Sequence, residues 1–356
     1  MGSKIISKKR IIFWAGILVS ILFLYLFLFG IEFTVQGKKI VYPGVDFKEV
    51  GRAMSNANYF YILPYYILYM LMFFIRAVRW GYFMEPIKKV SLSSLLSATF
   101  IGFMGNCIFP ARAGEVIRPV LIGMKEKVSK SACFATIVVE RIFDMTTLLL
   151  FSGFILIYFP FPSDLGNIGK SLKTAGICIA IMTFLLIIFL VLLKTKTELV
   201  LKIMKKVFSI LPEKMSDNLI KFIGSFIDGL GILGNLKNLI ISALLSICLW
   251  VVMATGFFIM LPAFGMKLPY SSGYLLTVIN ALGVALPSSP GFIGVYQVSI
   301  EVALKIMNVS DISNSKSYAI TIWALNMIFT ISVGMVLLWK ENLSLKDIRK
   351  SGEDSL

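Results

Sequence analysis

Residues 101–119 read IGFMGNCIFPARAGEVIRP, and this stretch decides how the chain is organised. It is apolar on both sides of an interruption at Pro110 and Gly114. Proline removes a backbone donor and glycine widens the allowed backbone conformations, so a helix should break here. At membrane depth, irregular backbone is tolerated only where protein or a wet cavity surrounds it. We therefore expect a helical hairpin over 91–123 whose break marks a functional centre.

The composition indicates a membrane protein. Of 356 residues, 58% are hydrophobic and 15% are charged, whereas soluble domains are about 45–50% apolar and about 25% charged. A helix needs about 20 apolar residues to cross a hydrocarbon core of about 30 Å. Runs of this length lie at 11–30, 58–80, 131–159, 174–193, 238–262 and 317–339. The expected fold is an all-α polytopic membrane protein with about six full spans.

A second apolar region, 271–307, is also interrupted. The residues that break it are Pro287, Pro290 and Gly291. If this region is a second re-entrant helical hairpin, the order span, span, hairpin, span occurs twice along the chain. The second copy then has the opposite orientation to the first. The Pro-x-x-x-Gly spacing is the same at both breaks. Duplicated transporter halves have this organisation, so the sequence predicts an inverted repeat. Loop charges do not distinguish two hairpins from four further full spans, because both layouts give the same sidedness.

This layout defines four parts of the chain. They are a first membrane repeat at 1–160, a fourth span with its connector at 161–237, the rest of the second repeat at 238–340 and a tail at 341–356. Short loops rich in Lys and Arg face the cytoplasm. All the charge clusters of this kind, including that of Arg76, Arg79, Lys88 and Lys89, fall on one side. The loops expected outside, near 160–173, 263–270 and 308–316, carry few Lys or Arg, although the outer loop at 31–57 has mixed charge. We expect both termini in the cytoplasm of a multi-pass cell-membrane protein.

The connector at 194–237 carries apolar residues at helical spacing, with lysines between them. The apolar positions are Leu199, Val200, Ile203, Met204, Val207 and Phe208, and the lysines are Lys202, Lys205 and Lys206. This pattern is typical of an amphipathic helix that lies on anionic headgroups at the membrane surface. A solvated charged linker is the alternative. Basic loops also explain the net charge of +16, so nucleic acid is not an expected partner.

Histidine is absent from the sequence, which excludes histidine-dependent catalytic relays and zinc sites with histidine ligands. The four cysteines, Cys107, Cys133, Cys178 and Cys248, fall inside apolar stretches without CxxC spacing. We expect no metal and no cofactor.

Six charged residues cluster inside two of the apolar segments, 91–123 and 131–159. The first hairpin carries Arg112, Glu115 and Arg118, and the third span carries Glu140, Arg141 and Asp144. Each would cost about 2.5–3.5 kcal/mol at mid-membrane, so together they would exceed the stability of about 5–15 kcal/mol of a typical domain. They must compensate one another. Arg141 and Asp144, three residues apart, can pair on one helix face.

These charges allow two interpretations. In the first, they form only a buried ion network that locks the hairpin to the third span. In the second, they form a site for an anionic headgroup, because the planar guanidinium forks of Arg112 and Arg118 match phosphate oxygens. Helix ends at the hairpin tip add free amides, and Asn106, one turn before Pro110, offers a donor and an acceptor.

Three motifs carry a resemblance to a known family. They are GNCIFPARAGEVIRP at 105–119, ERIFD at 140–144 and LPSSPGFIG at 286–294, together with Arg79-Trp80. The chain resembles, over nearly its whole length, the flippase-like integral membrane family related to the lysylphosphatidylglycerol synthase transmembrane region. That resemblance implies movement of charged or glycosylated lipids between leaflets. Multiple peptide resistance factors join this region to a soluble aminoacyl-transferase domain, which the present sequence lacks, so synthase activity is not implied.

The leading hypothesis is a lipid translocator whose two hairpins meet near the midplane and hold a phosphate-bearing headgroup. Its substrate would be a phospholipid, an aminoacylated or glycosylated lipid, or a polyprenyl phosphate. One rival is an integral-membrane transferase for lipid-linked substrates that uses Glu115, Glu140 or Asp144 as a general base. Another is a non-transporting subunit of an envelope or glycan assembly complex. Expected partners are membrane lipids, with a homo-oligomer or a lipid-modifying enzyme as further candidates.

Overall fold

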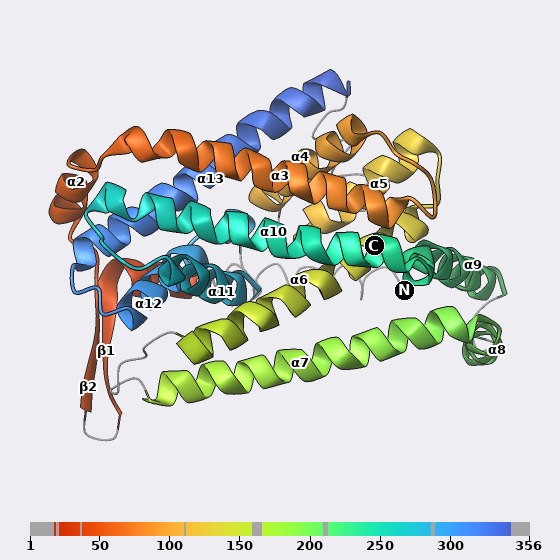
Figure 1. The fold of residues 1–356 in the computed structure, drawn as a ribbon, viewed down its shortest axis with the longest axis horizontal. Helices are drawn as coiled ribbons and strands as arrows, with labels where there is room; N and C mark the ends of the chain where they lie inside the picture. Colours follow the sequence, from red (N-terminus) through yellow and green to blue (C-terminus); the bar gives the residue numbers. More distant parts are fainter. Residues whose placement is uncertain are drawn as a thin grey trace.

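The computed structural model describes residue 18 and residues 21–35, 38–109, 112–158, 166–208, 213–285 and 289–342. Long helices dominate it (Figure 1). Two of them, α3 (Ile62–Met84) and α10 (Leu236–Met260), pack side by side in its centre. The start of α3 contacts the end of α10 through the short helices η1 (Tyr59–Tyr61) and η4 (Pro262–Phe264). The two central helices therefore run antiparallel.

Three helical stretches in the described part of the chain are long and apolar enough to cross a membrane. They are Tyr59–Met84, Leu236–Phe264 and Ile312–Lys340, and they coincide with the runs expected at 58–80, 238–262 and 317–339. The expected spans at 131–159 and 174–193 form helices of 29 and 30 residues, α6 (Lys130–Tyr158) and α7 (Gly166–Thr195). Much of the run at 11–30 lies outside the described residues. The chain is a multi-pass helical membrane protein.

Each broken apolar region forms a pair of packed helices. The first pair is α4 (Leu92–Ile108) and α5 (Gly114–Glu126), and the second is α11 (Ser271–Ala285) and α12 (Val295–Ile306), preceded by the turn η5 (Pro290–Phe292). The longest, α4, has 17 residues, about 25 Å at a rise of about 1.5 Å per residue, which is shorter than a hydrocarbon core of about 30 Å. Pro110 and Pro287 lie outside the described residues. Re-entry on one side stays a prediction.

Helix packing repeats between the two halves. In the first half α3 packs on α4, α4 on α5, and α5 on α6. In the second half α10 packs on α11, α11 on α12, and α12 on α13 (Ile312–Lys340). The halves also exchange equivalent contacts, because α13 packs on α4 and α6 packs on α11. Together with the antiparallel course of α3 and α10, this is the arrangement that an inverted repeat requires.

One segment adds β structure that hydropathy did not reveal. Strands β1 (Gly30–Val35) and β2 (Lys38–Pro43) pair antiparallel, with Gly30 opposite Pro43, and α2 (Phe47–Ser55) follows. We expected only a loop of mixed charge here. The sequence alternates β-branched and aromatic residues with polar ones in β1, which favours a strand. The hairpin projects from one end of the bundle (Figure 1).

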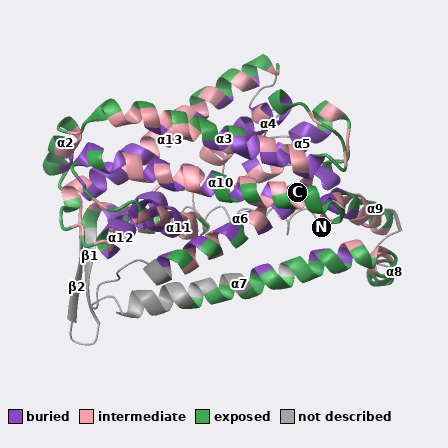
Figure 2. Cartoon of the chain, viewed as in Figure 1, coloured by how far each residue is buried: buried purple, intermediate pink, exposed green. Residues whose placement is uncertain are grey.

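The connector after α7 is helical, as its spacing predicted. It forms α8 (Thr197–Phe208), α9 (Glu213–Gly229) and η3 (Leu230–Gly234). Helix α9 packs on α6, whereas Leu199, Ile203 and Val207 of α8 are exposed. Figure 2 shows buried positions throughout α3, α10, α11 and α12, while the described part of α7 is largely exposed. Exposed Ile, Leu and Phe side chains on α7 fit a lipid-facing surface.

The first hairpin depends on two glycines that bring α4 and α5 into backbone contact. A Cβ at Gly114 would overlap the carbonyl oxygen of Gly102, and a Cβ at Gly102 would overlap the Arg118 side chain. This close approach positions Arg118 within the bundle.

We predict that Gly114→Ala lowers the free energy of unfolding by about 1–3 kcal/mol, because the added methyl group must push the two helices apart. Thermal melting in detergent measures this. The matched control is Gly153→Ala in α6, where nothing lies within 4 Å of the added Cβ. The control should be neutral or slightly stabilising because alanine favours helix. Equal melting of both variants would contradict the close packing.

Candidate anion site at the hairpin breaks

Glu140 lies at the centre of a buried charge cluster. Its carboxylate is 0% exposed and accepts both arms of the Arg118 guanidinium, each at 3.0 Å. Arg76 donates to the same carboxylate at 3.2 Å. The cluster therefore joins α5 and α3 to α6. A buried carboxylate is costly without such partners, so these contacts hold the three helices in register.

Asp144, one turn along α6 from Glu140, anchors the next part of the cluster. Arg79 donates to its Oδ1 at 2.8 Å, and the Trp250 indole donates to the same oxygen at 3.2 Å. Arg79 also donates to the Ser246 hydroxyl at 2.7 Å. Trp250 and Ser246 belong to α10, so this group of contacts links the two halves of the molecule.

Arg141 faces the same cluster from a more open position. It lies 2.7 Å from Glu140, 3.3 Å from Asp144 and 3.9 Å from Glu115. The pairing of Arg141 with Asp144 across three residues of one helix, which the spacing predicted, is confirmed. The Arg141 side chain keeps 30% of its surface exposed, compared with 2% for Arg118.

The two hairpin breaks meet at Arg112. This residue has a left-handed backbone, with φ of +52°, and its guanidinium donates to the Val284 carbonyl at the end of α11. The guanidinium also lies 5.7 Å from the centre of the Phe292 ring and 3.7 Å from Glu115. Gly291, beside Phe292, is left-handed too, with φ of +69°. Non-helical backbone at both breaks thus brings the hairpins together, as the sequence hypothesis required.

A cavity of about 430 Å³ opens beside this junction. Its charged lining residues are Arg76, Arg112, Arg118, Arg141, Glu115 and Asp144. Four arginines thus face two carboxylates, an excess of two positive charges. Glu140 and Arg79 lie behind this lining and cancel each other. The Nε atoms of three cavity arginines, Arg76, Arg118 and Arg141, have no hydrogen-bond partner among the described residues. Buried positive charge without full compensation favours binding of an anion.

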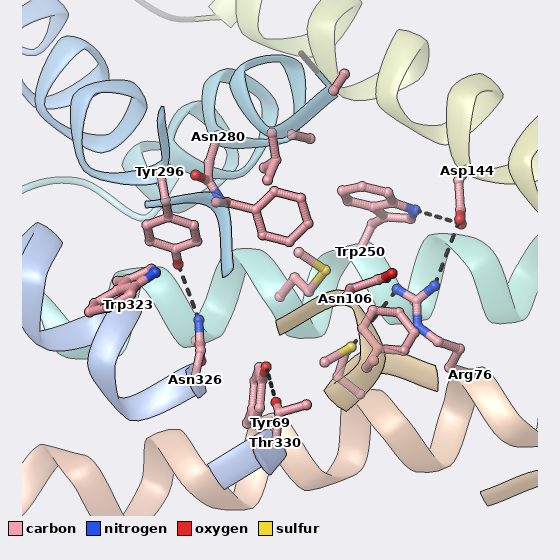
Figure 3. Close-up of a pocket in the computed structure, with 18 of the residues that line it drawn as sticks. Tyr69, Arg76, Asn106, Asp144, Trp250, Asn280, Tyr296, Trp323, Asn326 and Thr330 are labelled. Atoms are coloured by element: carbon pink, nitrogen blue, oxygen red, sulfur yellow. Dashed lines mark hydrogen bonds and ion pairs between the residues drawn. The ribbon is translucent and has the colours of Figure 1, made fainter. Parts of the chain in front are cut away.

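The other part of the cavity wall is aromatic and amide-bearing. Figure 3 shows Tyr296, Trp323 and Asn326 grouped away from the contact of Arg76 with Asp144. Tyr65 donates to the Asn326 oxygen at 2.5 Å, and Asn326 donates to the Tyr296 hydroxyl at 3.1 Å. These bonds connect α3, α12 and α13. They fix the aromatic wall without using arginines.

The structure revises the list of candidate site residues. It brings together Arg118, Glu140, Arg141 and Asp144, and it places Arg112 and Glu115 at the edge of the group. The assignment of Arg76 and Arg79 to a cytoplasmic loop is wrong. Both lie within α3 and are 5% and 0% exposed, because they pair with Glu140 and Asp144. Their position at the end of an apolar run, three residues apart, was the available signal.

Asn106 has a structural contact that the sequence left open. Its side-chain oxygen accepts from the Gly114 backbone amide at 2.8 Å, so it closes the gap between α4 and α5. Asn106 also lines the cavity. Pro290 and Gly291 begin the η5 turn, which contacts α4.

A second buried ion pair was missed altogether. Lys316 in α13 lies 3.0 Å from Glu301 in α12 and donates to the Phe27 carbonyl at 2.8 Å. The sequence suggested an outer loop at 308–316, but α13 begins earlier, at Ile312. This pair does not line the cavity. Through its bond to the Phe27 carbonyl, Lys316 connects the helical residues around Phe27 to the second half of the molecule.

In the described ranges, no group of three or more Cys, Asp or Glu side chains could hold a metal ion.

Comparison with known families agrees with the motifs. The model of the lysylphosphatidylglycerol synthase TM region matches residues 13–334, and the chain belongs to this family. The match includes both hairpins and the charge cluster.

Two curated relatives match this chain at low identity and over only part of its length. The chain is 25% identical over 146 residues to "Glycosyltransferase AglD" of Haloferax volcanii, covering 41% of this chain and 23% of that protein. It is 27% identical over 123 residues to "UPF0104 membrane protein MJ1595" of Methanocaldococcus jannaschii, covering 34% of this chain and 36% of that protein. The matches therefore span well under half of either relative. No solved structure matches.

The cluster predicts strong coupling between Arg118 and Glu140. Arg118→Met alone should lower the free energy of unfolding by up to about 3–5 kcal/mol, because it leaves a buried carboxylate short of a partner. Adding Glu140→Met should restore part of this loss. A double-mutant cycle from melting in detergent measures the coupling.

The control pair is Lys125 and Glu341, which lie 2.6 Å apart with side chains 40% and 25% exposed. A cycle there should give under about 1 kcal/mol. Additive effects of the Arg118 and Glu140 changes would contradict the network.

Proposed function

We propose that this protein is a translocator that moves a lipid with a phosphate-bearing headgroup between the leaflets of the cell membrane. The headgroup enters the cavity at the hairpin breaks, and the acyl or prenyl chains stay in the bilayer. The observation that carries the proposal is the excess of two positive charges among the side chains that line the cavity. A bound phosphate diester, with one negative charge, would neutralise half of that excess, and a doubly ionised phosphate monoester would neutralise all of it.

The exposed fractions assign different roles to the arginines. Arg118 is 2% exposed and gives both guanidinium arms to Glu140, so its role is to hold the carboxylate and the helix register. Arg112 and Arg141 keep 37% and 30% of their side chains exposed. Both lie near Glu115, at 3.7 and 3.9 Å, and Arg141 also pairs with Glu140 and Asp144 at 2.7 and 3.3 Å. We therefore propose Arg112 and Arg141 as the phosphate ligands.

Phosphate binding at Arg112 would also act on the contact between the hairpins. The Arg112 guanidinium donates to the Val284 carbonyl of α11. A phosphate that takes this guanidinium competes with the carbonyl and so favours a state in which the hairpins separate. A ligand shifts a conformational equilibrium only by its difference in affinity between the states, and the Arg112 contact supplies such a difference.

The family and its relatives support a role in lipid or glycan pathways. The transferase alternative requires a free general base. Glu140 is fully buried among arginines, and Asp144 is paired with Arg79 and Arg141. These contacts occupy both carboxylates as acceptors for arginines, which disfavours a general base at either position. Glu115, 31% exposed in the cavity lining, is the carboxylate that the transferase alternative would use.

The sidedness and the partners belong to the same proposal. Lysine-bearing α8, with Leu199, Ile203 and Val207 exposed, would lie on anionic headgroups at the cytoplasmic face, with both termini on that side. A homo-oligomer or a lipid-modifying enzyme would be further partners.

The test is leaflet exchange of fluorescent lipids in proteoliposomes. Wild type should exchange anionic lipids or polyprenyl phosphates faster than empty liposomes. Arg112→Lys keeps the charge but loses the planar fork, so exchange should fall nearly as far as in Arg112→Ala. Melting temperature provides the folding control.

A matched control is Arg52→Lys in α2, an exposed arginine outside the cavity, which should exchange like wild type. Recovery of most activity in Arg112→Lys would mean that Arg112 only balances Glu115. Wild type that exchanges no lipid, under several ion gradients, would overturn the proposal. Product formation from lipid-linked substrates would then support the transferase.

A further inference from the structure

The cavity has a second chemical end that a phosphate does not use. Its wall there includes four aromatic side chains from three helices: Tyr65, Tyr69, Tyr296 and Trp323. Two asparagines, Asn280 and Asn326, lie among them (Figure 3). Aromatic rings offer flat apolar faces, and amides offer both donors and acceptors. A headgroup that fills the whole cavity must therefore match an apolar and hydrogen-bonding surface as well as arginines.

Asn280 is the most informative of these residues. It is 5% exposed on α11, and its side-chain oxygen has no hydrogen-bond partner among the described residues. A buried acceptor without a donor costs about 1–3 kcal/mol, so a ligand that supplies the donor gains affinity. A phosphate diester and a hydrocarbon chain have no donor to give. A hydroxyl group does.

The neighbouring amide is already fixed. Asn326 accepts from Tyr65 and donates to Tyr296, and Tyr69 bonds Thr330 at 3.0 Å. These bonds hold the rings in place before a ligand arrives, which lowers the ordering cost of binding.

A cationic headgroup is the obvious competitor, since aromatic residues also bind ammonium groups. The charges oppose it. The carboxylates of the cavity lining are Glu115 and Asp144, and both are paired with arginines. The lining carries an excess of two positive charges, which repels an aminoacyl ammonium. A neutral group with many hydroxyls meets no such penalty.

We infer that the cavity binds a glycosyl phosphate headgroup, with the phosphate at the arginines and the sugar at the aromatic and amide end beside Asn280. A pyranose presents apolar C–H faces to aromatic rings and hydroxyls to amides, which is the chemistry of this wall. The volume of about 430 Å³ lies within the range of about 300–1,000 Å³ of small-molecule sites. The inference deepens the proposed function and rests on it for the location of the phosphate.

The experiment compares three lipids by binding titration in detergent. They are a polyprenyl phosphate, the glucosyl phosphate of the same polyprenol and lysylphosphatidylglycerol. Intrinsic tryptophan fluorescence reports binding, because Trp250 and Trp323 line the cavity. Wild type should bind the glucosyl phosphate at least about tenfold more tightly than the polyprenyl phosphate, as sites built to bond a hydroxyl discriminate strongly against its absence.

Two variants separate the ends of the cavity. Asn280→Leu should reduce the glucosyl preference to under about threefold and leave the Kd for polyprenyl phosphate unchanged. Arg112→Ala should weaken both ligands by the same factor. The control is Thr277→Val, one turn away on α11, whose hydroxyl bonds the Gly273 carbonyl at 2.7 Å and does not line the cavity. It should keep the full preference.

The wild-type comparison decides the inference even if a variant does not fold. Equal Kd values for the two polyprenyl lipids, or tightest binding of lysylphosphatidylglycerol, would overturn it. A glucosyl preference without leaflet exchange would support the ligand class and overturn the transport proposal. Exchange of polyprenyl phosphate without any glucosyl preference would support the transport proposal and overturn the glycosyl phosphate as the ligand class.

Discussion

The buried carboxylate of Glu140 is the constraint on which the rest of the structure depends. It is 0% exposed, and it can stay ionised in an apolar bundle only with cationic partners around it. Arg118, Arg76 and Arg141 supply them, from two other helices and from the next position on its own helix. The short first hairpin is thereby fixed to α3 and α6. Asp144 connects the same cluster to α10, because it accepts a hydrogen bond from the Trp250 indole.

The cationic cavity follows from this arrangement. The arginines that satisfy Glu140 and Asp144 are more numerous than these carboxylates, and Arg76, Arg118 and Arg141 also line the cavity. The hairpin breaks add irregular backbone beside the cavity. Left-handed backbone at Arg112 and Gly291 turns the chain at the point where the hairpins touch. The break at Arg112 costs helical backbone hydrogen bonds, and it also brings the Arg112 guanidinium, with 37% of the side chain exposed, to the edge of the cavity.

Much of this was predictable from the sequence, for physical reasons. Apolar runs of membrane length located α3, α10 and α13, and the prolines and glycines located both hairpins. Charges inside apolar segments identified Arg118, Glu140 and Asp144, because such charges must find partners. The family match was visible in the motifs of the first hairpin and third span.

The remainder depends on tertiary contacts that no local pattern specifies. Arg76 and Arg79 lie where an apolar run ends, so the sequence alone could not show whether they face water or α6. Glu301 lies inside the apolar region 271–307 and Lys316 directly before the run at 317–339, but the two meet only through packing of α12 on α13. The β1 and β2 hairpin lies in a segment whose mixed charge concealed its alternation. The aromatic wall draws on helices from both halves, so its residues share no motif.

The central claim is that the arginine excess at the hairpin breaks binds a lipid phosphate. Its most direct test is a cryo-electron microscopy structure in nanodiscs that contain the glucosyl phosphate of a polyprenol. The account predicts phosphate density between Arg112 and Arg141, with the rest of the headgroup extending toward Asn280. A cavity occupied only by hydrocarbon chains, with every phosphate at the outer surface of the bundle, would contradict it.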